Sequence, residues 1–185
     1  WKELNTDRKK IVINVPITYP PENINGYMVS CFLCTDINKA TFPAAFADFL
    51  KERDYIIDAD AWLVNNNPVS FLKQLIQALD KRFEITKELI VEDWDYFQLH
   101  IMETDRLLHF FIDYILREKR DMIGKLIEQF FVKLDEYIFW LVNLLATSSA
   151  IILLSDHGFC EIEEEVQLNC WLEANDFLKL SNHRC

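Results

Sequence analysis

Two pairs of aspartate and histidine are the residues of this sequence best suited to metal chemistry. Asp156 and His157 are adjacent and follow residues 150–154, an unbroken apolar run that predicts a strand buried on both faces of a parallel sheet. Asp105 and His109 are four residues apart, a spacing that places a carboxylate and an imidazole on one face of a helix. Both side-chain types bind divalent cations, so each pair is a candidate set of metal ligands.

Both pairs are expected just beyond the carboxyl end of a strand. Asp105 follows a strand predicted over residues 96–102, and the ligands of open parallel sheets collect outside such ends. Gly158 lets the backbone turn sharply after the second pair. Simpler alternatives stay open: residues 156–158 can form an ordinary strand-ending turn, and Asp105 can cap a helix that half-buries His109. The occurrence of two such pairs favours a two-metal site.

The elements that must position these residues alternate between strands and helices. The long helix from Pro68 is predicted by apolar residues that recur at helical spacing, whereas the strands are short β-branched or apolar runs. Strands are predicted near residues 9–15, 27–33, 55–58, 96–102 and 150–154, and helices over about 41–53, from 68 onward, 105–118, 123–145 and 169–178. This alternation predicts a layered α/β fold with a mostly parallel central sheet and helices on both faces.

Length and charge exclude several classes of protein. A chain of 185 residues with 51% hydrophobic residues fits one folded domain and is not disordered. The net charge of −11 argues against nucleic acid or anionic lipid as the primary partner. No apolar stretch has the roughly 20 residues that a membrane-spanning helix needs. The acidic run at residues 161–165 is interpreted as a solvated loop.

The cysteines indicate a reducing compartment. Their number, five, is odd in a chain of this length and does not suit a secreted disulfide framework, so we expect a cytoplasmic protein. Cys31 and Cys34 form a CxxC motif, but a zinc ribbon needs a second such motif and the sequence has none. We therefore interpret both as small buried hydrophobic residues.

Several motifs occur together and in order along almost the whole chain. They are Asn-Val-Pro-Ile-Thr-Tyr-Pro-Pro at 14–21, Asn-Gly at 25–26, Glu-Thr-Asp-Arg-Leu-Leu-His-Phe-Phe at 103–111, Ser-Asp-His-Gly-Phe at 155–159 and Asn-Cys-Trp-Leu at 169–172. On these motifs the sequence resembles the middle of an alkaline-phosphatase-superfamily protein. The branch is that of predicted phosphohydrolases or phosphomutases related to type I phosphodiesterases and nucleotide pyrophosphatases.

The resemblance implies a division of the ligands between two metals. Asp105 and His109 would hold one ion, together with a histidine that lies later in the family's chain. Asp156 and His157 would hold the other, with an early aspartate and a threonine or serine nucleophile expected before Trp1. Residues 1–185 are therefore expected to be the central part of a single phosphohydrolase-type catalytic domain that is alkaline-phosphatase-like but incomplete, and inactive when isolated.

Three further polar residues lie outside the two pairs. Arg106 could bind a substrate phosphate through its planar guanidinium group, although a surface or ion-pair role is an equally open alternative. His100 falls within a predicted strand and is interpreted as a core or paired residue. His183 lies three positions from the last residue and is interpreted as a frayed tail.

The implied chemistry is hydrolysis or transfer of a small phosphorylated substrate. Two cations about 4 Å apart stabilise the attacking and leaving oxygens of an in-line displacement at phosphorus, and one lowers the pKa of the nucleophile. The reaction would pass through a phospho-enzyme. Mixed aspartate and histidine ligation suits zinc and tolerates manganese or iron. The alternative is a non-catalytic binding or regulatory α/β domain that keeps the core but has no nucleophile.

Overall fold

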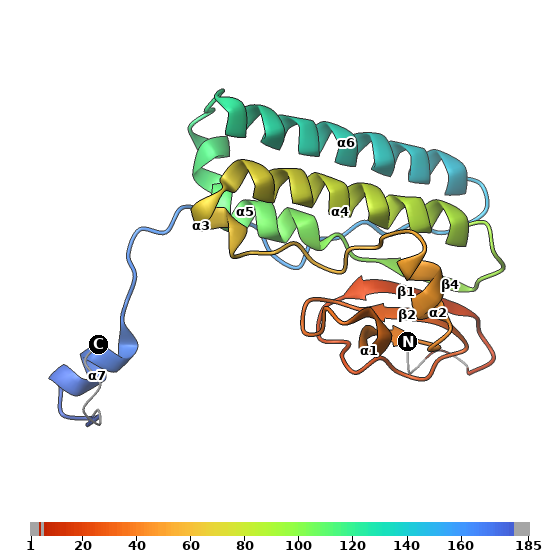
Figure 1. Cartoon of the computed structure of the whole chain (residues 1–185), viewed down its shortest axis with the longest axis horizontal. Coiled ribbons are helices and arrows are strands. Elements are labelled where there is room, and N and C mark those ends of the chain that lie inside the picture. Colours follow the sequence, from red (N-terminus) through yellow and green to blue (C-terminus); the bar gives the residue numbers. More distant parts are fainter. Residues whose placement is uncertain (1–3, 5, 180–185) are drawn as a thin grey trace.

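The computed structural model describes Leu4 and residues 6–179 and shows a mixed α/β fold (Figure 1). A small sheet lies on one side of a layer of long helices. In chain order the elements are β1 (Lys10–Val15), β2 (Gly26–Ser30), α1 (Ile37–Ala40), β3 (Thr41–Phe42), α2 (Phe46–Lys51), α3 (Leu63–Asn66), α4 (Pro68–Leu89), β4 (Tyr96–Leu99), α5 (Met102–Leu116), α6 (Met122–Leu145) and α7 (Leu168–Ala174).

The sheet has four strands in the order β3-β2-β1-β4 and is mostly parallel. β1 pairs in parallel with both β2 and β4, whereas the short β3 pairs antiparallel with β2. Gly26 begins β2 at a φ of 133°, where a Cβ atom would lie 1.9 Å from the carbonyl oxygen of Lys10. A side chain at this position would therefore collide with the neighbouring strand. The predicted strands at 9–15, 27–33 and 96–102 are confirmed as β1, β2 and β4, although β2 and β4 end earlier than predicted.

One core lies between the sheet and residues of the helices α1, α2 and α4. Ile11 and Ile13 are two residues apart on β1, so both point to the same face of the sheet, and both are fully buried. They pack in one cluster with Leu50 of α2 and with Ile85 and Leu89 near the end of α4. The C-terminal part of α4 therefore covers this face of the sheet.

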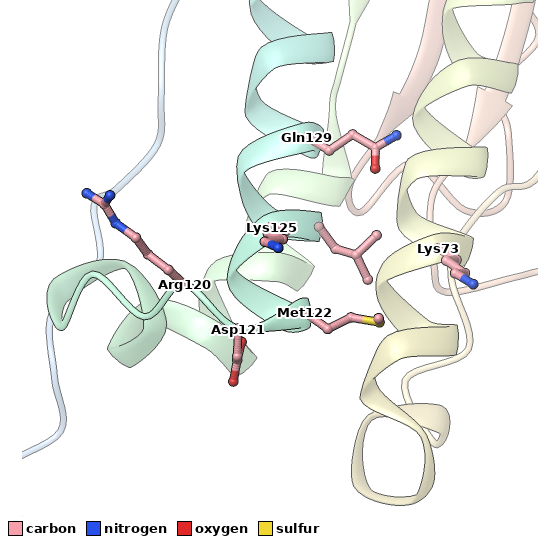
Figure 2. A pocket seen from close by; sticks show the side chains of 7 residues that line it. Lys73, Arg120, Asp121, Met122, Lys125 and Gln129 are labelled. Carbon is pink, nitrogen blue, oxygen red and sulfur yellow. The ribbon is translucent and has the colours of Figure 1, made fainter.

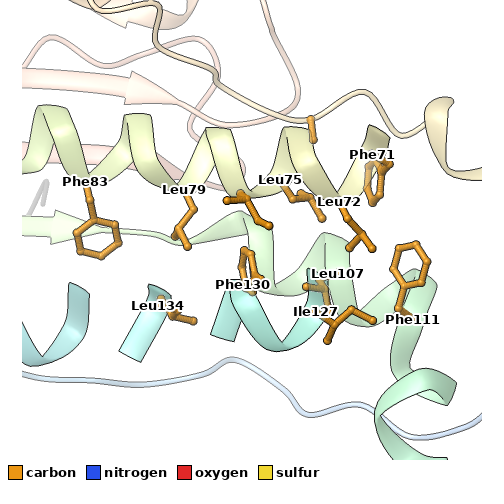
Figure 3. Close-up of a cluster of buried hydrophobic side chains, with 12 residues drawn as sticks. Phe71, Leu72, Leu75, Leu79, Phe83, Leu107, Phe111, Ile127, Phe130 and Leu134 are labelled. Carbon is orange, nitrogen blue, oxygen red and sulfur yellow. The ribbon is translucent and has the colours of Figure 1, made fainter. Parts of the chain in front are cut away.

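A second core holds α4, α5 and α6 together (Figure 3). The helix α4 begins cleanly because Asn67 accepts a hydrogen bond from the Ser70 N–H at 3.1 Å and Pro68 has no N–H to satisfy. Its buried stripe meets Leu107 of α5 and Phe130 of α6. The full cluster comprises Ala59, Phe71, Leu72, Leu75, Ile76, Leu79, Phe83, Leu107, Phe111, Ile127, Phe130 and Leu134. The predicted long helices are confirmed.

The predicted strand at residues 150–154 is wrong. This segment forms neither strand nor helix, and its side chains are exposed, Ile152 by 82%. A strand needs a neighbour that supplies a hydrogen-bonded ladder, and in the described part of the chain β4 pairs only with β1. An unbroken apolar run indicates a preference for burial, but it does not supply the partner strand.

The predicted strand at residues 55–58 is also wrong, for a different reason. Tyr55 and Ile57 are buried, as the apolar pattern suggested. The carbonyl oxygens of Ile56 and Ile57 accept hydrogen bonds from the guanidinium group of Arg82 at 3.4 and 3.2 Å instead of pairing with a strand. A side chain from α4 thus replaces the ladder.

The predicted helix at residues 41–53 is only partly confirmed. Its first residues form β3, and the helix α2 covers Phe46–Lys51 alone. The helix α1 lies wholly before this range and is capped by Asp36, which accepts from the Asn38 N–H at 3.1 Å. The closing helix is confirmed as α7, which lies apart from the other elements at the end of an extended connection (Figure 1).

Two further sequence expectations concern His183 and membrane-spanning segments. His183, interpreted as a frayed tail, lies outside the described residues. Among the helices of Leu4 and residues 6–179, none is long and apolar enough to cross a membrane.

Candidate metal centre

The first Asp/His pair is positioned by the link between β4 and α5. Only His100 and Ile101 separate the two elements, and the Thr104 hydroxyl donates to the Ile101 carbonyl at 2.9 Å, which closes the first turn of α5. Asp105 lies in this turn, and His109 follows four residues later. His109 Nε2 lies 3.3 Å from Asp105 Oδ1. The helical spacing therefore brings the carboxylate and the imidazole together as predicted.

The second pair meets the first at Asp105. His157 Nε2 lies 3.9 Å from Asp105 Oδ1 and 3.7 Å from Asp156 Oδ2. Residues 146–166 contain no helix or strand, yet they carry Asp156 and His157 to the start of α5. The expected proximity of the two pairs is confirmed, whereas their role as metal ligands stays a prediction.

The orientation of the His157 ring suits a ligand. Its Nδ1 lies 3.0 Å from the carbonyl oxygen of Gly158. A carbonyl oxygen can only accept a hydrogen bond, so the tautomer that forms this contact carries its proton on Nδ1 and keeps a lone pair on Nε2. Nε2 is the nitrogen that faces Asp105. Fixing the tautomer through the second nitrogen is how proteins orient metal-binding histidines.

Phe159 connects the two histidines. Its ring packs edge to face against His109, with centroids 4.9 Å apart, and against His157 at 5.1 Å. The last residue of the motif at 155–159 thus supplies an apolar contact that limits rotation of both imidazoles. The sequence contained this residue in a motif but gave no reason to assign it to the site.

Gly158 does not have the role expected from the sequence. Its φ is not positive, and a Cβ atom added there would meet no other atom within 4 Å. A glycine is therefore not required for the turn. Asp156 and His157 approach each other because the His157 N–H donates to Asp156 Oδ1 at 3.1 Å.

The cluster is open to solvent and is not a complete metal site. The Asp156 side chain is 77% exposed and that of His109 56%. In the part of the chain that the structure describes, no group of three or more His, Cys, Asp or Glu side chains is arranged to hold a metal ion. The donor types nevertheless fit a divalent cation, because imidazole and carboxylate suit zinc and tolerate manganese or iron.

Two hollows on the surface lie away from the candidate ligands. One of about 370 Å³ is lined by Lys73 of α4, by Arg120 just before α6 and by residues of the first turns of α6, including Lys125 (Figure 2). A second, of about 820 Å³, lies between α5 and α6. Neither is lined by any of the four candidate ligands, so the candidate site rests on its side chains rather than on a cavity.

Arg106 forms an ion pair. Its Nη2 and Nε donate to the two carboxylate oxygens of Asp58 at 2.6 and 3.2 Å, and its guanidinium lies over the ring of Phe32. This hydrogen bonding is the main reason that the pKa of Arg106 is raised. Of the alternatives left open by the sequence, the structure shows the ion pair, and the contact with substrate stays a prediction.

His100 is partly buried beside the site. Its backbone N–H donates to the Ile13 carbonyl at 3.0 Å, which extends the pairing of β4 with β1. Its Nε2 is buried and has no hydrogen-bond partner among the described residues. Burial and the positive charge of Arg82 lower the pKa of His100, and the negative charges of Glu103, Asp156 and Asp105 oppose that shift only in part. The imidazole is thus a neutral core group, as expected, but its Nε2 is not paired.

The cysteines and the acidic run largely behave as expected. Cys31 is buried, and burial raises the pKa of its thiol to about 11, so the thiol stays neutral. Cys34 is only half-buried, and both thiols are free. Residues 161–165 are exposed, although Glu161 pairs with Arg117 at 2.7 Å.

A buried polar network beneath the site was not predicted. Arg82 of α4 is fully buried and donates to Glu103, two residues before Asp105, and to the Tyr55 hydroxyl. One signal was present: Arg82 lies seven residues after Leu75 and therefore falls on the buried face of the helix. A charged residue on a core-facing stripe indicates a buried partner.

These features define an α/β protein whose acidic and imidazole side chains gather beyond the carboxyl ends of parallel strands. The family model for type I phosphodiesterase / nucleotide pyrophosphatase matches residues 12–183, so the chain belongs to this family, within the alkaline phosphatase superfamily. Membership supports hydrolysis of phosphate esters as the general class of reaction. No curated protein and no solved structure matches the chain.

Proposed function

We propose that Asp105, His109, Asp156 and His157 are ligands of a two-metal centre that hydrolyses or transfers phosphate esters. The observation that carries the proposal is the distance of 3.9 Å between His157 Nε2 and Asp105 Oδ1. This contact brings together two Asp/His pairs whose aspartates, Asp105 and Asp156, are 51 residues apart in the sequence. Family membership supplies the reaction class. Zinc is the preferred ion, with manganese or iron as alternatives.

The residues of the chain have separable tasks in this proposal. The carboxylates of Asp105 and Asp156 would offset the positive charge of the ions, and the imidazoles would complete the donor set. When bound, divalent cations polarise phosphoryl oxygens and lower the pKa of a coordinated hydroxyl group. The Gly158 carbonyl keeps the proton of His157 on Nδ1, so that Nε2 is free to bind.

The substrate class follows from the same centre. A small phosphorylated molecule would place its phosphate at the two carboxylate and imidazole pairs, beside Arg106. Arg106 would contribute through Nη1, since Nε and Nη2 are occupied by Asp58. We also infer that the chain is part of a single catalytic domain with an alkaline-phosphatase-like arrangement of helices on both faces of the sheet.

Zinc binding by the chain tests the proposal. Metal-free protein would be titrated with Zn²⁺ by calorimetry, alongside Asp156→Asn and the control Glu163→Gln, which removes a charge from the same exposed segment. Loss of a ligand should weaken Zn²⁺ affinity by at least about 100-fold, because removing a residue that only hydrogen-bonds to a metal ligand already lowers metal affinity by about 10–100-fold. Equal affinity for Asp156→Asn and the control would reject Asp156 as a ligand and favour a non-catalytic domain.

A further inference from the structure

The start of α5 is held by an unusual pair of buried charges. Arg82 is 0% exposed and Glu103 2%. Charged side chains are almost never buried to this extent unless they are paired. Arg82 Nε donates to the two carboxylate oxygens of Glu103 at 3.0 and 3.1 Å, and Nη2 donates to one of them as well. The two charges therefore satisfy each other inside the protein.

The other donors of Arg82 are also used. Nη1 donates to the Tyr55 hydroxyl, and Nη2 donates to the carbonyl oxygens of Ile56 and Ile57. One guanidinium group thus joins α4, the first turn of α5 and the irregular segment 55–58. The planar fork of arginine can make these contacts at once, and a lysine ammonium cannot.

A second ion pair fixes the same turn to the same segment. Arg106 of α5 donates twice to Asp58, and the Asp58 side chain is only 10% exposed. Glu103 and Arg106 flank Asp105 in sequence. The turn that carries Asp105 is therefore tied to residues 55–58 on both sides of this candidate ligand.

The network continues to the carboxyl ends of two strands. The Tyr55 hydroxyl donates to Asn14 Oδ1 at 3.4 Å, and Asn14 Nδ2 donates to Cys31 Sγ at 3.4 Å. Asn14 forms a bulge in β1 at a φ of 61°, and Cys31 directly follows β2. Bulges of this kind occur beside functional sites because they redirect a side chain. The strand ends and the start of α5 are thus one hydrogen-bonded unit.

We propose that Arg82, Glu103 and Tyr55 are positioning residues that hold Asp105 and His109 in the geometry needed to bind metal. The inference rests on the proposed function of these two ligands. A buried ion pair is weak evidence for stability, because apolar residues of similar volume often serve a fold equally well. The network therefore contributes orientation of the first turn of α5, a property that an apolar replacement cannot reproduce.

The decisive experiment separates stability from orientation. In the double variant Arg82→Met, Glu103→Leu, no unpaired charge is left in the core, so the variant should still fold. Its melting temperature in chelator should be lower than that of the wild type, because the Tyr55 hydroxyl and the Ile56 and Ile57 carbonyls lose their donor. Its affinity for Zn²⁺ should nevertheless fall about 10-fold, the lower end of the effect seen when outer partners of metal ligands are lost. Unchanged affinity in a double variant that remains folded would overturn the proposal.

Two single variants complete the test. Glu103→Gln should weaken Zn²⁺ binding, whereas Glu88→Gln should not, because Glu88 forms a similar two-bond pair with Arg53 at the surface, away from the site. Equal effects of the two would contradict the proposal. If Glu103→Gln does not fold, the double variant decides.

A readout without metal keeps this inference distinct from the proposed function. Amide hydrogen exchange across residues 102–106 of the metal-free protein should be faster in the double variant than in the wild type, by more than the change in global stability accounts for. Wild-type protein that binds no Zn²⁺ would reject the proposed metal centre itself. Unchanged exchange in the variant would reject the positioning role, whether or not the wild type binds metal.

Discussion

Removal of the Phe130 side chain tests whether α6 completes the helical core. Phe130 is 0% exposed and lies in the cluster shared by α4, α5 and α6 (Figure 3). Truncation of a fully buried phenylalanine to alanine costs the lost transfer free energy and leaves a cavity, together about 3–5 kcal/mol. Domains of this kind are stable by about 5–15 kcal/mol, so Phe130→Ala should remove a large share of the free energy of unfolding.

Phe139 is the matched control for this substitution. It lies on the same helix but is 70% exposed, so Phe139→Ala removes the same atoms without opening a cavity and should change stability by only about 0.5 kcal/mol. Urea unfolding followed by circular dichroism would give both midpoints, with equal slopes as the check on two-state behaviour. A difference between the variants below about 1 kcal/mol would refute the assignment of Phe130 to the core.

Three other substitutions test titratable groups. Burial and the hydrogen bond to Asp80 raise the pKa of Tyr137 in the folded protein, so stability is lost as pH rises above the ordinary value of 10. In Tyr137→Phe the melting temperature should therefore fall less steeply with rising pH. Burial lowers the pKa of His100 in the folded protein, so the unfolded state binds the proton first and the free energy of unfolding falls as pH drops below about 6.5. His100→Gln should reduce this loss of stability in acid. An unchanged dependence of the free energy of unfolding on pH would contradict the lowered pKa. Asp156→Asn should cut hydrolysis of bis(4-nitrophenyl) phosphate by at least about 100-fold, measured on the protein expressed from its complete gene with added Zn²⁺, while His100→Gln stays near wild type.

The sequence predicted best those features that a local pattern determines. The apolar stripe of α4 recurs every three or four residues, so both its helical state and its buried face could be predicted. The spacing of Asp105 and His109 likewise determined their proximity, because both lie on one helix. Such features need no knowledge of the rest of the chain.

Long-range partners could not be predicted in the same way. Residues 150–154 and 55–58 both have apolar strand patterns, but neither pattern shows which segment would complete a hydrogen-bonded ladder. The buried network depends on contacts such as Arg82 with Glu103, which are 21 residues apart. Arg82 could have been recognised as a buried charge by its place on the stripe, whereas its partner could be identified only from the structure.

Zinc K-edge X-ray absorption of the Zn²⁺-loaded protein tests the central claim most directly, since it reports the ligands themselves. If the two Asp/His pairs bind zinc, the first shell should contain only nitrogen and oxygen at about 2.0–2.2 Å, with the outer-shell scattering of imidazole. That imidazole signal should decrease in His157→Ala. Sulfur at about 2.3 Å, or an imidazole signal unchanged in His157→Ala, would show that the metal is bound elsewhere and would contradict the assignment.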